Sequence, residues 1–443
     1  MNLLPCLETV DRDALFDPCI AEVKRPAIME PLRERIGLGD DMSAGEPAVV
    51  EDFLRSTTWA DPYPVYSRWR ERSPVLARMP FVLPDGSEIE TFNWLLLRHR
   101  EVYGVLRDHE TFSSEPPQVP GLSVPRLPLV QDDPPRHSVL RRLVSKAFTA
   151  RRIAQLEPWI RQNAEELLEA MVGGEAEVMD GLAVPLPVRV IARLLGIPGE
   201  DYVAFKRWSD TFLSINTRDL EPGSRARNAM EMAAYFGRVV AERRVQGAED
   251  LITALVEAEL DGERLPEVEV LGFCVLLLIA GNETTTNLIG NMLNLLATRP
   301  ELWRRVREDR ALVEPTIEEV LRYESPVQTL FRFVRRNTEI GGREIFQHTT
   351  VALGFGAANR DPAVFAEAEQ FNIGRDWSSH VAFGGGIHYC LGAPLARVEA
   401  AVALNAMLDR YETIAPGSRP RTRQNATNLV FGFTQLPLRV TRG

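Results

Sequence analysis

A glycine-rich segment, Phe383 to Gly392, contains the cysteine of this 443-residue chain that is best placed for chemistry. The segment reads Phe-Gly-Gly-Gly-Ile-His-Tyr-Cys-Leu-Gly, and a helical run follows it. Three consecutive glycines permit a tight turn and a close approach of the backbone to another group. Cys390 then opens a helix, where free N–H groups and the helix dipole stabilise a thiolate. This arrangement favours a nucleophile or a metal ligand, because a buried structural cysteine would explain neither the glycines nor the nearby His388. No Lys-Ser/Thr pair follows, so a phosphate-binding loop is the poorer interpretation.

An acid and a hydroxyl, Glu283 and Thr284, stand side by side in an apolar helix predicted over roughly 268–296. Burying such groups among leucines is costly unless something uses them. A threonine inside a helix more often bonds back to the carbonyl four residues earlier, here that of Ala280. The residues alone support a functional and a structural role equally.

A third feature is Glu319-Val320-Leu321-Arg322, in which the acid and the base share one face of a helix and can pair. Most such pairs are solvated and contribute little. Taken alone, this pair indicates almost nothing about function.

In their order and spacing, these three features together resemble the cytochrome P-450 family of haem-thiolate monooxygenases, of the soluble bacterial type. The resemblance covers nearly the whole chain from about Phe53 onward. It implies a mainly helical α+β fold, a triangular helical domain with small antiparallel sheets. It also implies that Cys390 is the axial thiolate ligand of the iron of haem b, with Phe383 and Gly384 in the cofactor-binding loop.

The resemblance assigns roles to the other two features as well. Glu283 and Thr284 would be catalytic and relay protons to bound dioxygen, while Ala280 and Gly281 would leave room over the iron. Glu319 and Arg322 would form the buried pair that serves folding and haem retention. The two haem propionates need cationic or donor partners, and the family pattern supplies four: His137, Arg141, Arg332 and His388.

Three positions depart from the family pattern. Gln370 stands where many members place an arginine that joins the Glu319–Arg322 pair, and Arg360 is a candidate substitute. The segment 346–349, Phe-Gln-His-Thr, replaces the usual Pro-x-Gly-Thr turn. Glu283 stands where many relatives have Asp, and both residue types can relay protons.

By resemblance, the implied reaction inserts one oxygen atom of dioxygen, as a hydroxyl group, into a small-to-medium apolar organic molecule. Terpenes, fatty acids, steroids, aromatics and macrolides all fit such a pocket. Its expected walls include the loop 116–128, the region 205–216 and the residues Leu276, Ala280, Leu330, Phe331 and Phe433. Phe331 and Phe433 are equally consistent with plain core positions.

Electrons would come from NAD(P)H through a separate ferredoxin or flavodoxin and its reductase, since no cysteine cluster or dinucleotide loop indicates a fused redox domain. A basic docking patch and a merely solvated face are equally good interpretations of Arg141, Arg142, Lys146 and Arg397. Two other functions remain open: a peroxide-driven peroxygenase and a non-catalytic haem sensor or carrier. The intact Glu283–Thr284 pair disfavours both.

Composition sets the outer limits of this interpretation. A net charge of −11 argues against nucleic acid as a partner. Four scattered cysteines without a CxxC pair exclude a disulfide framework and a four-thiolate zinc site, and predict a cytoplasmic protein. No signal peptide appears at the start, and the longest apolar run, 270–280, falls short of the ~20 residues that insert in a membrane. We expect a soluble monomer.

The elements that must position these residues follow from periodicity. The apolar spacing in Ile153, Leu156 and Ile160, and again in Val188, Ile191 and Leu195, predicts helices. Two strands, 75–78 and 94–98, flank the turn signal Pro84-Asp85-Gly86, and a second small β region is predicted around 339–342 and 350–353. Length alone suggests about three domains, but we expect a partly ordered polar extension, 1–50, and a single haem-binding domain, 51–443.

Overall fold

The computed structural model describes residues 52–53, 59–82, 88–116, 126–171, 174–197, 202–213, 223–260 and 262–443. The predicted extension 1–50 lies outside these ranges, as do the Pro84-Asp85-Gly86 turn and most of the loop 116–128. The division into extension and domain therefore stays a prediction.

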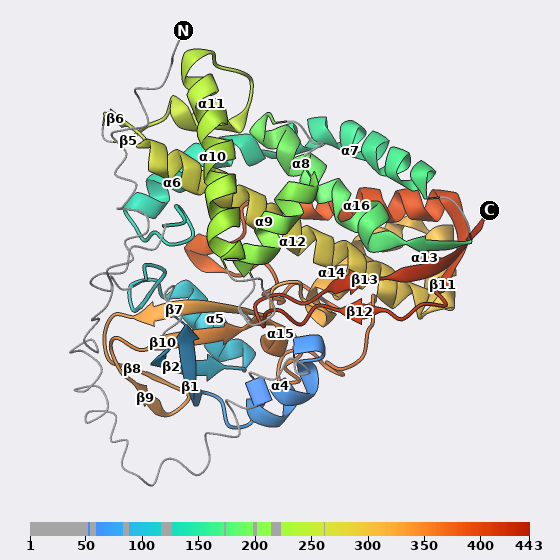
Figure 1. Ribbon diagram of the computed structural model, residues 1–443. Coiled ribbons are helices and arrows are strands. Elements are labelled where there is room, and N and C mark those ends of the chain that lie inside the picture. The colour runs from blue at the N-terminus through green and yellow to red at the C-terminus, as the bar shows by residue number, and fades with distance from the viewer. Residues whose placement is uncertain are drawn as a thin grey trace.

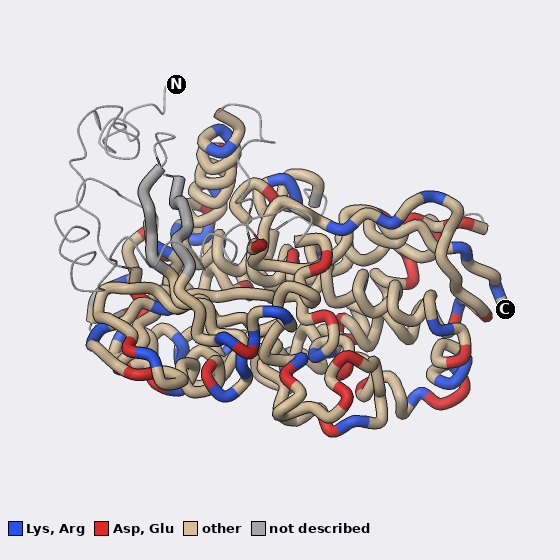
Figure 2. The backbone as a smooth tube through the Cα atoms, turned by 90° about the horizontal axis from the view of Figure 1, so that it is seen from below, with Lys and Arg blue, Asp and Glu red and all other residues tan. Residues whose placement is uncertain are grey.

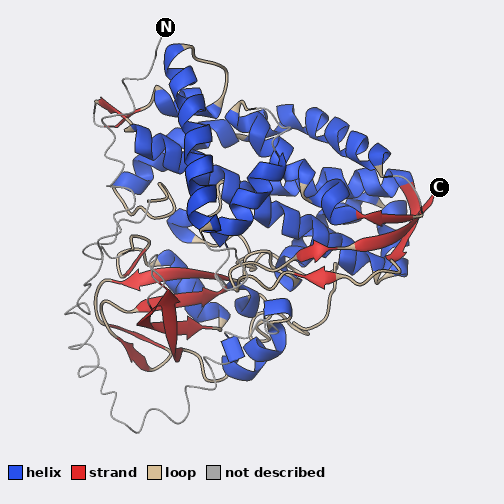
Figure 3. Ribbon diagram, in the orientation of Figure 1, coloured by secondary structure: helices blue, strands red, loops and turns tan. Residues whose placement is uncertain are grey.

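Helices dominate the molecule, and the strands gather in one sheet beside the helices and in small sheets at the other end (Figures 1 and 3). The helices are α4 (Tyr63–Arg70), α5 (His99–Arg107), α6 (Arg136–Ser145), α7 (Ala150–Ala170), α8 (Pro185–Leu195), α9 (Tyr202–Leu213), α10 (Ser224–Val245), α11 (Leu251–Val256), α12 (Glu267–Ala297), α13 (Pro300–Glu308), α14 (Val313–Tyr323), α15 (Phe355–Ala358) and α16 (Ala393–Arg410). Short 3-10 or π segments are η2 (Lys146–Phe148), η3 (Met179–Ala183), η6 (Arg310–Leu312) and η7 (Gly386–His388).

The central helix α12 matches the helix predicted over 268–296 and runs through the middle of the helical region (Figure 1). It packs against α8, α9, α10, α14 and α16. Within the described ranges, α12 is the one helix that is long and apolar enough to cross a membrane. Burial in the core explains this apolarity, because nearly all residues from Asn282 to Ala297 are buried.

The apolar faces predicted for α7 and α8 are confirmed. Ile153 and Ile160 of α7 and Val188 and Leu195 of α8 are buried, and α7 packs along α16. These contacts place α16, which follows the cysteine loop, between α7 and α12 (Figure 1).

The predicted strands 75–78, 94–98 and 350–353 belong to one five-stranded sheet with the order β1-β2-β10-β7-β3, whereas the predicted segment 339–342 lies in a separate two-stranded ribbon. Its strands are β1 (Val75–Val82), β2 (Glu88–Leu96), β3 (Phe112–Ser113), β7 (Thr329–Val334) and β10 (Thr350–Gly354). β10 pairs in parallel with β2 and antiparallel with β7, so Val351 faces Trp94 on one side and Arg332 on the other. The sequence did not predict β7.

Smaller antiparallel pairings complete the fold. The strands β4 (Glu175–Glu177), β11 (Tyr411–Pro416) and β14 (Pro437–Arg442) form a three-stranded sheet. Three two-stranded ribbons join β5 (Glu259–Leu260) to β6 (Glu263–Arg264), β8 (Thr338–Ile340) to β9 (Arg343–Ile345), and β12 (Thr422–Arg423) to β13 (Phe433–Gln435). The predicted fold class, mainly helical with small sheets, is confirmed.

The departing segment 346–349 still forms a turn. His348 adopts a φ of +68°, a left-handed conformation that glycine takes most easily and histidine tolerates. Its N–H donates to the carbonyl of Val334 at 2.9 Å, so the turn leading into β10 is anchored to the end of β7.

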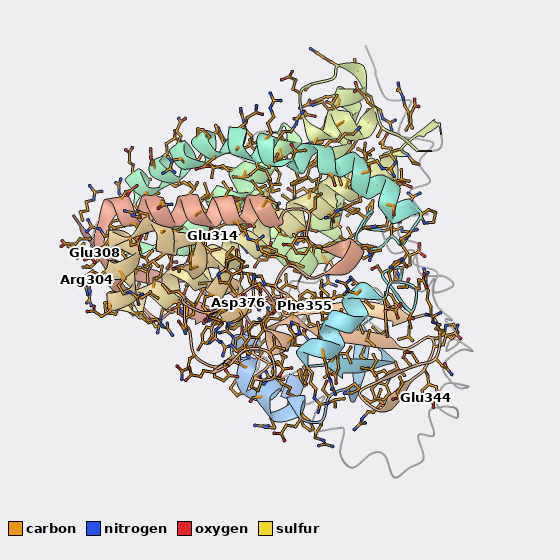
Figure 4. The ribbon with its side chains drawn as sticks, turned by 180° about the vertical axis from the view of Figure 1, so that it is seen from behind. Arg304, Glu308, Glu314, Glu344, Phe355 and Asp376 are labelled. Carbon is orange, nitrogen blue, oxygen red and sulfur yellow. The ribbon has the colours of Figure 1, made fainter. Side chains whose placement is uncertain are left out.

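Phe355 connects the sheet with the helices. It begins α15 directly after β10 and lies deep in the molecule between the two regions (Figure 4). Its Cζ lies 4.0 Å from the position that a Cβ on Gly384 would occupy. The sheet therefore reaches the cysteine loop through this ring.

Charged residues of both signs are interspersed along the chain (Figure 2). On the side shown there, acidic and basic segments alternate, so the net charge of −11 is not gathered into a single acidic face.

Candidate functional site

Glycine is required at two positions of the cysteine loop by the backbone geometry. Gly384 and Gly386 have φ values of +72° and +63°. A Cβ on Gly386 would lie 2.2 Å from the carbonyl oxygen of Leu106 in α5, so only glycine allows this approach. The N–H of Cys390 donates to the carbonyl of Phe383 at 2.9 Å. The loop is thus closed on itself and pressed against α5.

Two opposing effects act on the Cys390 thiol, which stands three residues before α16. Burial raises its pKa, whereas the backbone N–H groups of Gly392 and Ala393 and the guanidinium groups of Arg141 and Arg397 oppose the rise. A cation bound at the sulfur would tip this balance toward the thiolate. The site suits a thiolate ligand of a metal.

The four predicted propionate partners converge from three segments. The rings of His137 in α6 and His388 in the cysteine loop are 4.3 Å apart. Arg141, one turn further along α6, and Arg332 of β7 both lower the pKa of His388 electrostatically, although burial is the larger cause of that decrease. We call His137, Arg141, Arg332 and His388 the cationic cluster, after its two guanidinium groups.

This cluster contains polar groups without partners. Arg332 is buried and, in the part of the chain that the structure describes, donates one hydrogen bond, from Nη1 to the carbonyl of Phe331 at 2.8 Å. Neither Arg332 nor Arg141 pairs there with a carboxylate. Desolvation lowers the pKa of Arg332 to about 10. Nε2 of His137 is buried with no hydrogen-bond partner, and burial lowers the pKa of this histidine to about 4. Such groups are rare unless a ligand satisfies them.

Asp133 is a buried acid next to His388 of the cluster, and the sequence analysis did not identify it. Its carboxylate accepts from Ser113 Oγ at 2.5 Å and from Arg335 at 2.7 Å, and lies 3.9 Å from Nε2 of His388. Burial opposes its ionisation, but hydrogen bonds from His388, Ser113 and Ser114 hold its pKa well below the usual range. The signal that could have identified Asp133 is its place four residues before His137.

The residues predicted to stand over the iron lie on α12. Ala280 is exposed in the middle of this largely buried helix, so it borders open space. The Thr284 hydroxyl donates to the Ala280 carbonyl at 2.8 Å, which is the structural alternative considered for this threonine. Thr284 itself is only partly buried.

Gly281 has a packing role that the sequence did not indicate. A Cβ there would lie 2.4 Å from Cδ1 of Ile191 in α8. The absence of a side chain therefore allows α8 to pack on α12, whereas Ala280 is the residue that borders the open space.

Glu283 is buried and has two partners. Lys206 of α9 places its Nζ 3.0 Å from Oε2, and Nδ2 of Asn287 donates to Oε1 at 3.2 Å. Lys206 also pairs with Asp210. No local sequence pattern indicated Lys206, because this residue lies on another helix, far from Glu283 in the chain.

The Glu319–Arg322 pair is fully buried and bidentate, with distances of 2.7 and 2.8 Å. The third partner left open by Gln370 is Arg375, whose Nε lies 3.5 Å from Oε1 of Glu319. Arg360, the suggested substitute, instead pairs with Glu369 at 2.9 Å. Gln370 contributes its backbone carbonyl, which accepts from Arg322 at 3.0 Å.

The five expected pocket residues do not share one environment. Leu276 is buried in the α12 core, and Leu330 is exposed. Phe331 is half-buried against a cluster near α4. Phe433 is buried in the helical core, with the Arg423 guanidinium 3.7 Å from its ring centre. Phe433 therefore has the surroundings of a core residue.

Comparisons with known proteins agree on one family. A family model described as "Cytochrome P450" matches residues 202–442. The chain is 36% identical over 406 residues to "Cytochrome P450 monooxygenase PikC" of Streptomyces venezuelae, covering 89% of this chain and 94% of PikC. The structure of cytochrome P450 CYP109Q5 from Chondromyces apiculatus matches at 39% identity with a TM-score of 0.76, covering 88% of this chain and 98% of that one. CYP109E1 from Bacillus megaterium in complex with testosterone matches at 34% identity with a TM-score of 0.77, covering 87% and 99%.

Proposed function

Since this chain belongs to the cytochrome P-450 family of monooxygenases, we propose that it binds haem b through Cys390 and hydroxylates an apolar organic molecule with one oxygen atom of dioxygen. The observation that carries the proposal is the cationic cluster. It holds a buried, acid-free Arg332 and an unpartnered His137 Nε2 close to the cysteine loop.

The residues present fit the haem. Two propionate groups would give Arg332, Arg141, His137 and His388 the anionic partners that the chain itself does not supply. Cys390 would hold the haem iron through its sulfur, and the N–H groups beside the sulfur would stabilise the thiolate. Bound haem supplies the oxygen chemistry, and an electron-rich thiolate ligand favours cleavage of the O–O bond.

The chain supplies the protons. Glu283 and Thr284 lie side by side on α12, and Thr284 is only partly buried. We assign Glu283 to proton delivery from its carboxylate and Thr284 to the ordering of hydrogen bonds at its hydroxyl. The hydrogen bond from Thr284 to the Ala280 carbonyl fixes the position of the hydroxyl group. The hydroxyl oxygen of Thr284 can still accept a hydrogen bond from another group.

Electrons would arrive from NAD(P)H through a separate ferredoxin or flavodoxin. Of the four basic residues considered for docking, Arg142 and Lys146 are exposed, Arg141 is half-buried, and Arg397 pairs with Glu318. Arg142 and Lys146 are therefore the better candidates for contact with an acidic redox partner. A reduction rate that falls as salt rises would support this docking, and a rate that salt does not change would contradict it.

The substrate is assigned only by class. Ala280 and the exposed Leu330 offer apolar surface, and CYP109E1, a solved relative, was captured with testosterone. We propose a small-to-medium apolar molecule, in a cytoplasmic and monomeric enzyme.

The test reconstitutes the purified protein with a surrogate ferredoxin, its reductase and NADH, under labelled dioxygen. We expect candidate substrates that shift the ferric haem to high spin to give a hydroxylated product that carries the label. Product formed only with hydrogen peroxide would instead indicate a peroxygenase, and haem binding with no product from any spin-shifting compound would indicate a sensor or carrier.

A further inference from the structure

Glu318 is a buried acid next to the Glu319–Arg322 pair in sequence, but it points to different partners. It is 1% exposed and lies on α14. Its Oε1 accepts from Nε of Arg397 at 2.5 Å, and its Oε2 accepts from Nη2 of the same guanidinium at 3.0 Å. This bidentate geometry fixes both the position and the plane of the Arg397 side chain.

Arg397 in turn rests on the cysteine loop. Its Cζ lies 4.5 Å from the ring centre of Phe383, within the range of a cation–π contact. The carbonyl of Phe383 accepts the N–H of Cys390. Arg397 therefore covers the residue that holds the cysteine backbone, and its charge favours the thiolate form of Cys390.

His380 ties the beginning of the same loop to the same acid. Its Nδ1 accepts the N–H of Ala382 at 3.2 Å, so Nε2 carries a proton and donates it to Oε2 of Glu318 at 2.8 Å. Glu318 thus holds the cysteine loop at two points, through His380 before Phe383 and through Arg397 above it.

We infer that Glu318, Arg397 and His380 form a clamp that holds the Cys390 loop in its ligating position, and that Arg397 serves this clamp rather than partner docking. The inference rests on the proposed role of Cys390 as the iron ligand. All three are positioning residues, because they act on the iron through the loop. The helix α14 thus carries two neighbouring acids with separate roles, because Glu319 pairs with Arg322 and Glu318 holds the cysteine loop.

The decisive variant is Glu318→Gln, because the clamp predicts weaker haem retention and a docking role for Arg397 does not. It removes a negative charge and leaves Arg397 in place, so a docking role predicts reduction by ferredoxin that is unchanged or faster. The clamp predicts that haem transfers to apomyoglobin about tenfold faster or more, as expected when a charge-assisted hydrogen bond is lost. It also predicts that part of the ferrous carbon monoxide complex loses the long-wavelength absorption band of a thiolate-ligated haem.

The matched control is Glu314→Gln, an exposed acid one turn earlier on α14 (Figure 4). Arg397→Lys provides a second test that keeps the charge, and we expect it to lose the fork geometry and release haem faster than the wild type. Arg304→Lys, at an exposed arginine of α13 that pairs with Glu301, is its surface control.

The outcomes separate the clamp from the proposed function. If the wild type lacks the thiolate band, the proposed function fails. If the wild type has this band and Glu318→Gln and Arg397→Lys retain haem and band as well as their controls do, the clamp is wrong. Slower reduction of Arg397→Lys with unchanged haem retention would return Arg397 to the docking surface.

Discussion

Lys206 Nζ lies 3.0 Å from Oε2 of Glu283, and this ion pair joins α9 to α12. The same ammonium group pairs with Asp210 on the more exposed side. The charges of these carboxylates raise the pKa of Lys206, although desolvation opposes the increase. Lys206 is therefore charged throughout the working pH range and holds Glu283 in one position.

Lys206→Gln should lower the free energy of unfolding by about 1–3 kcal/mol, because Glu283 stays buried without its cation. Urea denaturation of the haem-bound protein measures the change. The control is Arg207→Gln, on the same helix as Lys206, which breaks an exposed ion pair with Glu231 of α10. This variant should lower the free energy of unfolding by less than about 1 kcal/mol. Equal losses in the two variants would mean that the Lys206–Glu283 contact has no special weight.

Thr284→Ala should keep its haem but convert much of the NAD(P)H consumed into hydrogen peroxide, since no hydroxyl remains to order the proton delivery. Product per NAD(P)H should fall about tenfold or more, and Thr284→Ser should restore it. Thr298→Ala is the control, because Thr298 also bonds back to a carbonyl of α12 but lies at its C-terminal end. An unchanged product yield in Thr284→Ala would remove Thr284 from the mechanism.

Arg332→Gln should have opposite effects on the two forms of the protein. Haem should transfer to apomyoglobin about tenfold faster or more, because a charge-assisted contact to a propionate is lost. The apoprotein should become more stable, because a buried cation without an acid partner is removed. Thermal unfolding of the haem-bound and haem-free forms measures the change in stability, with the exposed Arg336→Gln as control. A destabilised apoprotein would contradict the prediction.

Glu399 of α16 predicts a pH dependence of stability. It is 2% exposed, and burial alone raises its pKa from 4.5 to about 8. Between about pH 4.5 and 8 the folded state keeps a proton that the unfolded state has lost, so stability falls as the pH rises through this window. Glu399→Gln should flatten the fall and unfold at a higher temperature than the wild type at pH 8. The exposed Glu308→Gln should change nothing, and a pH profile of Glu399→Gln parallel to the wild type would exclude this acid as the cause.

Local sequence patterns predicted the parts of the site that depend on one segment. The Cys390 loop needs glycines at fixed places, α12 is apolar over its length, and Glu319 and Arg322 share a helix face. All three are therefore visible without a structure. The resemblance also predicted that His137, Arg141, Arg332 and His388 belong together, and the fold brings them into one cluster.

Contacts between distant segments could not be predicted in this way. Arg375, not Arg360, reaches Glu319, because the chain after Ala368 folds over Arg322 and offers it backbone carbonyls. Lys206 meets Glu283 only through the packing of α9 on α12. The strand β7 was missed because Arg332 interrupts its apolar residues.

The parallel pairing of β10 with β2 has a consequence for folding. The two strands are separated by most of the chain, and Asn93 can meet Thr350 only after every helix from α5 to α14 has been synthesised. The β1–β2 hairpin therefore leaves the ribosome with an open edge and must wait for its partner. Contacts this distant in sequence make folding slow and leave that edge open to pairing with other chains.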